Sequence, residues 1–451
     1  MGRLFGTDGV RGIAGTELDC TLAANLAKAA AMVLEERTGR HPKIIIGRDT
    51  RISGQMLEAA VSSGLCSVGA DAVLLGVLPT PAVAYLVGQL GADAGIMLSA
   101  SHNSYEYNGI KIFGADGFKL TDDEEFEIEE IVLDKKMPYT ERWGAQLGRI
   151  TTEYNAVDRY IDHITGAVQG SLSGLRVAVD CANGSASATA QRLFDRLGAQ
   201  VEIRNANPDG LNINRNCGST HIGELCTMMR SGSFDLGIAY DGDADRCLAV
   251  DEHGNEISGD RIIAMLAKHL KDQGKLENHS VAVTVMSNFG FFQFAQNHGI
   301  KAETTRVGDR YVLERMLERN ISIGGEQSGH IIFRDYMTTG DGQLSSIKLL
   351  ELMRDAARPV SELAQVMEEF PQVLVGVRAD ATMKARWELD EGVRLCMERG
   401  NARLAGTGRI LVRASGTEPL IRVMVEGSDQ TMIEEIAQEI AQTIRDRLEQ
   451  K

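Results

Sequence analysis

Short apolar runs alternate with helical patterns along most of the chain, and each run ends in a polar corner. Runs that predict buried strands occur at residues 43–46, 73–75, 95–98, 176–179, 200–203, 236–240, 281–285 and 321–323. Between them apolar residues recur at helical spacing, as at Leu57, Val61 and Leu65. Strands that alternate with helices through short connections are typical of α/β domains. Because the pattern restarts twice, we expect three successive α/β domains with mixed, mostly parallel sheets.

The pattern changes after residue 371. Residues 373–377 and 410–412 predict strands of an antiparallel sheet, with a long helix expected from Trp387 to Cys396. A closing helix from about residue 429 carries isoleucines at helical spacing, namely Ile433, Ile436, Ile440 and Ile444. These elements predict a smaller α+β domain at the end of the chain. The expected domains are residues 1–155, 156–255, 256–369 and 370–451.

Two helix starts carry capping signals. Thr-Asp-Asp-Glu at residues 121–124 predicts a capping box. Ser53 is expected to cap the helix that contains Leu57.

The length of the chain indicates several domains, and its charge disfavours some classes of binding partner. With 451 residues the chain is too long for a single core. Its formal net charge of -16 disfavours binding to nucleic acid or to an anionic membrane surface, so we expect neither partner. The apolar region at residues 72–98 is interrupted by Pro79 and Pro81, and the first residues turn polar at once, so no membrane span or signal peptide is expected.

The cysteines point to a reducing compartment. There are seven, they are scattered, and no Cys-x-x-Cys occurs. This disfavours a disulfide framework or a zinc site and favours a cytoplasmic protein.

Ser-Ala-Ser-His-Asn at residues 99–103 follows the strand expected at 95–98. In α/β sheets ligands bind beyond the carboxyl ends of strands, which places Ser101 where a nucleophile or phosphate carrier could act. On this pentapeptide alone, a polar turn remains the better interpretation.

Asp-Gly-Asp-Ala-Asp-Arg at residues 241–246 places three carboxylates on alternate residues. Such carboxylates repel one another, and a hard divalent cation such as Mg²⁺ or Ca²⁺ relieves the repulsion. The twelfth position is Glu252, as in an EF-hand, but the sixth is Arg246 where that loop requires glycine, and both flanks predict strands. We therefore reject the EF-hand and favour a metal site over a solvated acidic turn.

Two further loops combine polar groups with glycine. Arg-Ala-Ser-Gly-Thr at residues 413–417, with Arg422 downstream, offers what a phosphate dianion needs, although an ordinary hairpin turn is equally consistent. Gly-Glu-Gln-Ser-Gly-His at residues 325–330 presents a carboxylate and a hydroxyl that could bridge sugar hydroxyls, and again a turn is the alternative. His330 alone is more typical of a structural histidine.

Taken in order, these four loops and Phe-Gly-Thr-Asp-Gly-Val-Arg-Gly at residues 5–12 resemble the α-D-phosphohexomutase family over the whole chain. The resemblance implies an isomerase with its active site in a central cleft. Within the family, Gly-Glu-Gln-Ser-Gly-His at residues 325–330 and Asn-Ile-Asn-Arg-Asn-Cys-Gly-Ser-Thr-His at residues 212–221 are most similar to the members that act on glucosamine phosphates. This similarity implies interconversion of glucosamine 6-phosphate and glucosamine 1-phosphate for amino-sugar nucleotide and cell-wall precursor synthesis.

Two alternatives remain. One is the same chemistry on glucose or mannose phosphates. The other is a non-catalytic sugar-phosphate sensor, which would be expected to lack Ser101 or one of the aspartates, and all of these are present.

The resemblance also implies residue roles and cofactors. Ser101 would be phosphorylated, and one Mg²⁺ per chain would be held by Ser101, Asp241, Asp243 and Asp245. Glu326 and Ser328 would bind sugar hydroxyls. The phosphate that is not being transferred would be gripped by Arg413, Ser415, Gly416, Thr417 and Arg422. Proton transfer or charge stabilisation near Ser101 would fall to Lys111, Arg11 and His330.

Further expectations concern ligands and assembly. A hexosamine bisphosphate would be intermediate and activator, the partners would be small-molecule sugar phosphates, and the protein would be a monomer or homodimer. One departure is Ser104, where the family usually has proline, so the loop loses a fixed φ angle.

Overall fold

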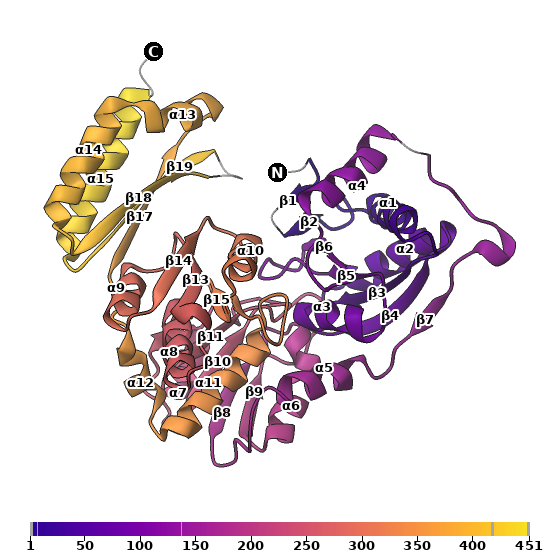
Figure 1. The fold of residues 1–451 in the computed structure, drawn as a ribbon, viewed down its shortest axis with the longest axis horizontal. Coiled ribbons are helices and arrows are strands. Elements are labelled where there is room, and N and C mark those ends of the chain that lie inside the picture. Colours follow the sequence, from indigo (N-terminus) through magenta and orange to yellow (C-terminus); the bar gives the residue numbers. More distant parts are fainter. Residues whose placement is uncertain (1–2, 7, 137, 416–418, 449–451) are drawn as a thin grey trace. The chain divides into compact units, whose positions relative to one another are not determined.

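The computed structural model describes the chain except residues 1–2, 7, 137, 416–418 and 449–451. It contains two compact units, one formed by Met1–Met286 with Ile300–Val366 and the other by Ser287–Gly299 with Met367–Lys451. The first unit holds three mixed sheets with helices, and the second holds one antiparallel sheet with helices (Figure 1). Three α/β domains followed by a smaller α+β domain are thereby confirmed.

The first sheet has the strand order β1-β2-β6-β5-β3-β4-β7. Its pairs among β3, β4, β5 and β7 are parallel, whereas the pairs that involve β1, β2 or β6 are antiparallel. The strands are Phe5–Gly6 (β1), Gly9–Ile13 (β2), Lys43–Arg48 (β3), Asp71–Val77 (β4), Ala94–Leu98 (β5), Tyr107–Gly114 (β6) and Ile150–Thr152 (β7). The helices are Cys20–Thr38 (α1), Ser53–Ser67 (α2), Thr80–Gln89 (α3) and Asp122–Asp134 (α4).

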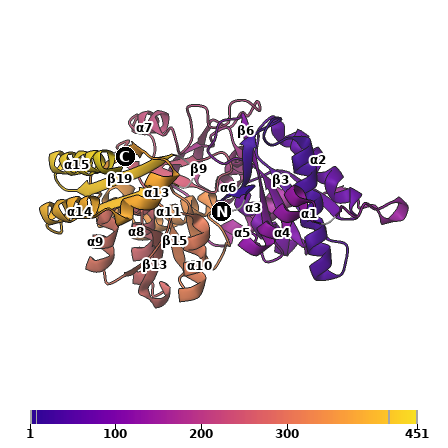
Figure 2. The same ribbon diagram turned by 90° about the horizontal axis from the view of Figure 1, so that it is seen from above.

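Both faces of this sheet are covered, which explains its continuous apolar runs. Ile44 and Ile46 of β3 belong to the core formed with α1, α2 and α4. On the other face Gly95 of β5 packs so closely on α3 that a Cβ there would lie 2.6 Å from the Val87 side chain. Figure 2 shows α1 and α2 on one side of β3 and α3 on the other.

The second and third sheets follow the same plan. The second has the order β12-β11-β10-β8-β9 and the third the order β14-β13-β15-β16, each with an antiparallel addition to a parallel centre. Their strands are Arg176–Asp180 (β8), Gln200–Arg204 (β9), Leu236–Tyr240 (β10), Cys247–Val250 (β11), Glu256–Ile257 (β12), Ser280–Thr284 (β13), Lys301–Thr305 (β14), Ile323–Gly325 (β15) and Ile331–Phe333 (β16). The helices are Ala156–Thr165 (α5), Ala190–Leu197 (α6), Gly223–Met229 (α7), Gly259–Asp272 (α8), Asp309–Arg319 (α10), Gly342–Ala356 (α11) and Val360–Leu363 (α12).

The second unit is built on an antiparallel sheet of order β17-β19-β18. Its strands are Gln372–Arg378 (β17), Gly408–Ala414 (β18) and Leu420–Gly427 (β19), and its helices are Phe289–Asn297 (α9), Ala381–Arg386 (α13), Glu391–Leu404 (α14) and Gln430–Leu448 (α15). The four isoleucines expected on the closing helix are all buried in the core of this unit. The prediction that these isoleucines form the buried face of α15 is therefore confirmed.

The capping signals had mixed outcomes. The capping box at Thr121 and Glu124 is confirmed. The expected cap at Ser53 is wrong, because Ser53 is the first residue of α2 and its hydroxyl accepts a hydrogen bond from Asn108 instead. The helix expected from Trp387 to Cys396 is also wrong in its start. Asp390 caps α14 through the Val393 amide, so Trp387 lies in a separate 3-10 turn.

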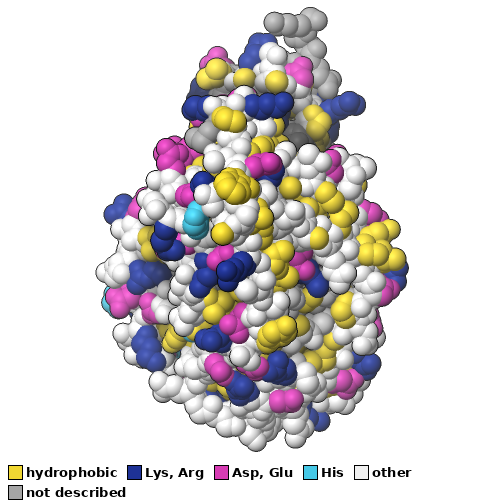
Figure 3. All heavy atoms as spheres, turned by 90° about the vertical axis from the view of Figure 1, so that its right-hand side faces the viewer, with side chains coloured by type: hydrophobic (Ala, Val, Ile, Leu, Met, Phe, Trp, Pro, Cys, Tyr) yellow, Lys and Arg dark blue, Asp and Glu magenta, His cyan; other side chains and the backbone are white. Residues whose placement is uncertain are grey.

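No helix within the described residues is both long and apolar enough to cross a membrane. On the face shown in Figure 3, Lys and Arg side chains lie interspersed with Asp and Glu side chains. The net negative charge is thus distributed over a surface of mixed sign on this face.

Helix α9 packs tightly within the second unit. The Asn288 side chain before it donates to the Phe370 carbonyl at 2.9 Å and accepts from the Phe370 amide at 3.0 Å. The first turn contains Gly290, where a Cβ would lie 1.7 Å from the Glu368 carbonyl oxygen. A glycine at this position is therefore required by close backbone packing.

We expect Gly290→Ala to destabilise the protein by about 1–3 kcal/mol, because the added methyl cannot be accommodated without moving the backbone. Gly88→Ala is the matched control, since this helical glycine of α3 is exposed with no atom near its Cβ position. There alanine should stabilise by about 0.4–1 kcal/mol. Chemical denaturation of the two variants should give free-energy changes of opposite sign, and equal effects would contradict the packing argument.

Candidate functional site

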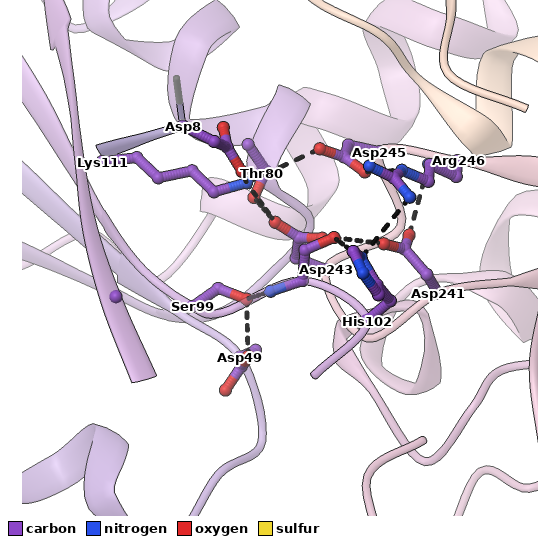
Figure 4. A network of polar contacts seen from close by, with 12 residues as sticks. Asp8, Asp49, Thr80, Ser99, His102, Lys111, Asp241, Asp243, Asp245 and Arg246 are labelled. Atoms are coloured by element: carbon purple, nitrogen blue, oxygen red, sulfur yellow. Dashed lines mark hydrogen bonds and ion pairs between the residues drawn. The ribbon is translucent and has the colours of Figure 1, made fainter. Parts of the chain in front are cut away.

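The first unit brings most of the expected site residues together at one place, and Figure 4 shows Lys111 beside the three aspartates. Ser101 follows β5, the three aspartates lie between β10 and β11, and Lys111 lies in β6. His330 precedes β16, and Arg11 lies in β2. The site thus contains residues at strand ends of all three α/β sheets, as expected for α/β architecture. Lys111 and Arg11 add side chains from within strands of the first sheet.

Ser101 lies at a strained corner of the chain. It is buried, and its φ angle of 50° lies in the left-handed region that serine rarely adopts. Its hydroxyl donates to Asp241 Oδ2 at 2.6 Å, and its amide donates to Ser99 Oγ at 3.0 Å. The strained conformation and the contact with Asp241 make this hydroxyl a candidate functional group.

Asp241, Asp243 and Asp245 form a cluster whose ligand atoms lie within 4.8 Å of one another. All three are buried, and burial together with repulsion by the other two raises the pKa of Asp241 well above its usual value. The strands on both sides, β10 and β11, confirm that this is no EF-hand.

Two oxygens of this cluster accept no hydrogen bond from the described residues. Asp243 Oδ1 and Asp245 Oδ1 are buried and have no hydrogen-bond partner among the described residues. Asp243 Oδ2, in contrast, accepts from Thr80 Oγ1 at 2.5 Å and from Lys111 Nζ at 2.8 Å. Three buried carboxylates, two orphaned oxygens and a serine hydroxyl fit a hard oxygen-binding cation such as Mg²⁺.

Lys111 is the principal positive charge beside the cluster. Its ammonium group lies 2.8 Å from Asp243, 2.9 Å from Asp8 and 3.5 Å from Asp245. Burial alone would lower the pKa of Lys111, but these carboxylates outweigh it and raise the pKa above its usual range. Arg11 joins the same group through Asp8, to which its guanidinium donates.

His330 lies between two carboxylates of the site. Its Nδ1 is 3.6 Å from Asp245 Oδ2, and its Nε2 is 3.6 Å from Asp309 Oδ2. Nε2 accepts the Gly340 amide at 3.0 Å, which assigns the ring proton of the neutral form to Nδ1. The imidazole is thus buried and oriented by backbone and carboxylate together.

Sequence reasoning missed several members of the site. His102 Nδ1 lies 3.5 Å from Ser101 Oγ, and burial with the nearby Arg246 and Arg11 lowers the pKa of His102 to about 4. Lys119 bridges Asp8 and Asp309 at 2.6 Å each. His102 and Asp8 were within the quoted motifs, whereas Lys119 and Asp309 lay outside any pattern.

The expected sugar loop connects β15 and β16 in the first unit. Glu326 Oε1 accepts the Gly308 amide at 3.1 Å. Ser328 Oγ is buried and, within the part of the chain that the structure describes, has no hydrogen-bond partner. A hydroxyl left in this state is suited to a ligand hydroxyl.

The expected phosphate loop lies in the second unit. Arg413 of β18 is paired directly with Arg422 of β19, so two like charges face each other across the ladder. Burial and the nearby Arg422 lower the pKa of Arg413. Ser415 is buried and donates its amide to Leu420 at 2.8 Å, while Gly416 and Thr417 lie outside the described residues.

Comparison with known families gives matches along nearly the whole chain. Four families described as phosphoglucomutase/phosphomannomutase match in order: alpha/beta/alpha domain I at residues 2–138, domain II at 158–254, domain III at 258–370 and the C-terminal domain at 353–443. The order agrees with the three α/β sheets and the final antiparallel sheet described above.

Individual relatives extend this result. A phosphoglucosamine mutase of Caldicellulosiruptor saccharolyticus is 51% identical over 99% of this chain and 100% of its own length. Another, of Clostridium novyi, is 49% identical over 99% of both chains. A phosphoglucomutase/phosphomannomutase family protein of Burkholderia thailandensis shares the fold with a TM-score of 0.84 at 22% identity, over 98% of this chain and 97% of the other. The chain belongs to the phosphoglucomutase/phosphomannomutase family, and full-length relatives within it bear the name phosphoglucosamine mutase.

Proposed function

We propose that this protein is a phosphoglucosamine mutase, an isomerase that interconverts glucosamine 6-phosphate and glucosamine 1-phosphate. The observation that carries the proposal is the Ser101 hydroxyl, 2.6 Å from Asp241 within a buried cluster of three aspartates. The choice of the amino sugar rests on relatives of that name at 49–51% identity over nearly the full chain.

In the proposed reaction Ser101 carries a phosphoryl group. A hydroxyl oxygen of the sugar phosphate attacks the phosphorus, the bond to Ser101 Oγ breaks, and the sugar becomes a bisphosphate. The bisphosphorylated hexosamine then turns so that its other phosphate meets Ser101. The Ser101 hydroxyl attacks that phosphorus, the bond to the sugar oxygen breaks, and phosphoserine is regenerated as the isomeric monophosphate leaves. In both transfers the proton of the attacking hydroxyl is replaced on the oxygen that leaves phosphorus. Such transfer depends on positioning and on charge neutralisation more than on new covalent chemistry.

The residues around Ser101 supply that neutralisation. Asp241, Asp243, Asp245 and Ser101 would hold Mg²⁺, which when bound supplies Lewis-acid stabilisation to the transferring phosphate. Lys111, whose raised pKa keeps it charged, stabilises negative charge rather than accepting a proton. Arg11 adds a second charge through the Asp8 contact. His330 is the candidate for proton transfer, since imidazole titrates closest to neutrality.

The two remaining loops would bind the rest of the substrate. Glu326 and Ser328 hold sugar hydroxyls. The facing guanidiniums of Arg413 and Arg422 bind the phosphate that is not being transferred, since a dianion removes their mutual repulsion. Ser415, Gly416 and Thr417 complete this loop. Because the bisphosphate turns, the loop must accept either phosphate.

A coupled assay with glucosamine, glucose and mannose 6-phosphates tests the function. We expect the highest kcat/KM with glucosamine 6-phosphate and, in intact-protein mass spectra, a fraction heavier by one phosphate that maps to Ser101. Ser101→Ala should lose this fraction and the mutase activity while keeping its fold. Normal turnover by Ser101→Ala would refute the mechanism, and a clear preference for a neutral sugar would refute the substrate.

Asp243→Asn should weaken Mg²⁺ binding, measured by calorimetry, and lower kcat by about 100-fold or more. The fold should persist, because Lys111 keeps Asp8 and Asp245 as partners. Undiminished Mg²⁺ affinity in the variant, or full activity of the wild type in excess chelator, would contradict the metal assignment.

Arg422→Ala should raise KM about tenfold and also lower kcat, because binding energy at a remote phosphate helps to orient the reacting end. Inhibition by inorganic sulfate should weaken in parallel. The exposed Arg378 of β17 offers a control on the same sheet, and Arg378→Ala should leave both parameters unchanged. If Arg422→Ala lowers thermal stability but leaves KM and sulfate inhibition unchanged, the phosphate-binding role is refuted. Arg422 then only stabilises the β18–β19 hairpin.

A further inference from the structure

Arg51 is buried beneath the loop that carries Ser101. Its side chain is among the largest fully buried ones in the described chain, at 1% exposure. Guanidinium Nη2 donates to the carbonyls of Ser101 and Asn103 at 2.9 Å each, and Nη1 donates to Tyr107 at 3.0 Å and also to Ser104. One side chain thus binds three backbone carbonyls of this loop and one at the start of β6.

Arg51 is itself fixed from behind. Its Nε donates to Asp49 Oδ2 at 2.8 Å, and the same oxygen accepts from Ser99 Oγ at 2.6 Å. Ser99 Oγ in turn accepts the Ser101 amide at 3.0 Å. Hydrogen bonds therefore connect the Ser101 carbonyl, through Arg51, Asp49 and Ser99, to the Ser101 amide. Both peptide groups of Ser101 are fixed by this network.

Asn214 holds the same loop from the second α/β domain. Its Nδ2 donates to the carbonyls of Ser101 and Asn103 at 2.9 Å each. The contact is close, because a Cβ on Gly242 of the aspartate loop would lie 2.5 Å from the Ser101 carbonyl and 2.8 Å from Asn214 Nδ2. The Ser101 carbonyl is therefore clamped by donors from two domains next to the aspartate cluster.

We propose that Arg51 and Asn214 are positioning residues that hold Ser101 in its left-handed conformation with Oγ against Asp241. A left-handed serine persists only where its surroundings determine it, and the carbonyl that both residues bind sets the direction of the Ser101 backbone. The two side chains also restrict the backbone of this loop. The family's usual proline would restrict it as well, but this chain has Ser104 at that position. The inference rests on the proposed function, because it concerns the phosphate carrier of that reaction.

Asn214→Gly is the decisive variant. Glycine accepts the Asn214 φ angle of 58° without strain, so the substitution removes the side chain without straining the backbone. Asn216→Gly is the matched control, since Asn216 has a φ angle of 57° in the same loop and is exposed. We expect kcat of Asn214→Gly to fall about tenfold or more with KM nearly unchanged, because misplacement of a reacting group affects turnover. Asn216→Gly should stay within about twofold of the wild type.

Single-turnover transfer from phosphorylated protein to the sugar phosphate should slow by the same factor as kcat. Calorimetric melting separates positioning from general stability, because a purely structural Asn214 would lower the melting temperature and leave kcat per folded molecule intact. That outcome would overturn the inference. Loss of activity to the same extent in both glycine variants would overturn it as well.

Arg51→Lys provides an independent test. Lysine keeps the charge beside Asp49 but cannot reach four carbonyls with a planar fork, so kcat should fall further than in Asn214→Gly. If Arg51→Lys does not fold, the glycine pair still decides. Failure of the inference is distinguishable from failure of the proposed function. In the first case Ser101→Ala is inactive while Asn214→Gly turns over normally, and in the second Ser101→Ala itself is active.

Discussion

The repulsion among three buried carboxylates is the constraint on which the site depends. Asp241, Asp243 and Asp245 cannot all ionise in a buried place unless positive charge and hydrogen-bond donors reach them. The described part of the chain supplies Lys111 and Thr80 at Asp243 and places His330 beside Asp245. These partners come from different domains of the first unit. Compensation of the three carboxylates therefore depends on how those domains pack against one another.

Ion pairs outside the aspartate cluster also connect the domains of the first unit. Asp8 contacts Lys111 and Lys119, Lys119 contacts Asp309, and Asp309 lies beside His330. Positive and negative groups alternate along this path, which joins the first sheet to the third α/β domain. Because Lys111 and His330 are buried and the other three groups are only partly exposed, loss of one charge leaves its neighbours with less compensation. The network therefore favours one arrangement of the three domains in which the site is assembled.

How much the sequence could predict depended on the range of the interactions. The strands, the isoleucine face of α15 and the aspartate cluster were predictable, because each is a pattern within a few neighbouring residues. The start of α14 was missed since a competing cap at Asp390 decided it locally. Arg51, Lys119 and Asn214 could not be assigned, because the site residues that they bind lie fifty or more residues away along the chain.

This difference in range has a physical consequence for the site. Alternate residues in one loop bring three carboxylates together by themselves, so the spacing of the aspartates is local. The direction of the Ser101 hydroxyl is not local, since its carbonyl is fixed by Arg51 from the end of β3 and by Asn214 from the second domain. A change in domain packing therefore displaces the serine relative to the aspartates and also removes charge partners from the cluster, although the three carboxylates stay close to one another. The position of the Ser101 hydroxyl is therefore more sensitive to substitutions in other domains than the spacing of the three aspartates is.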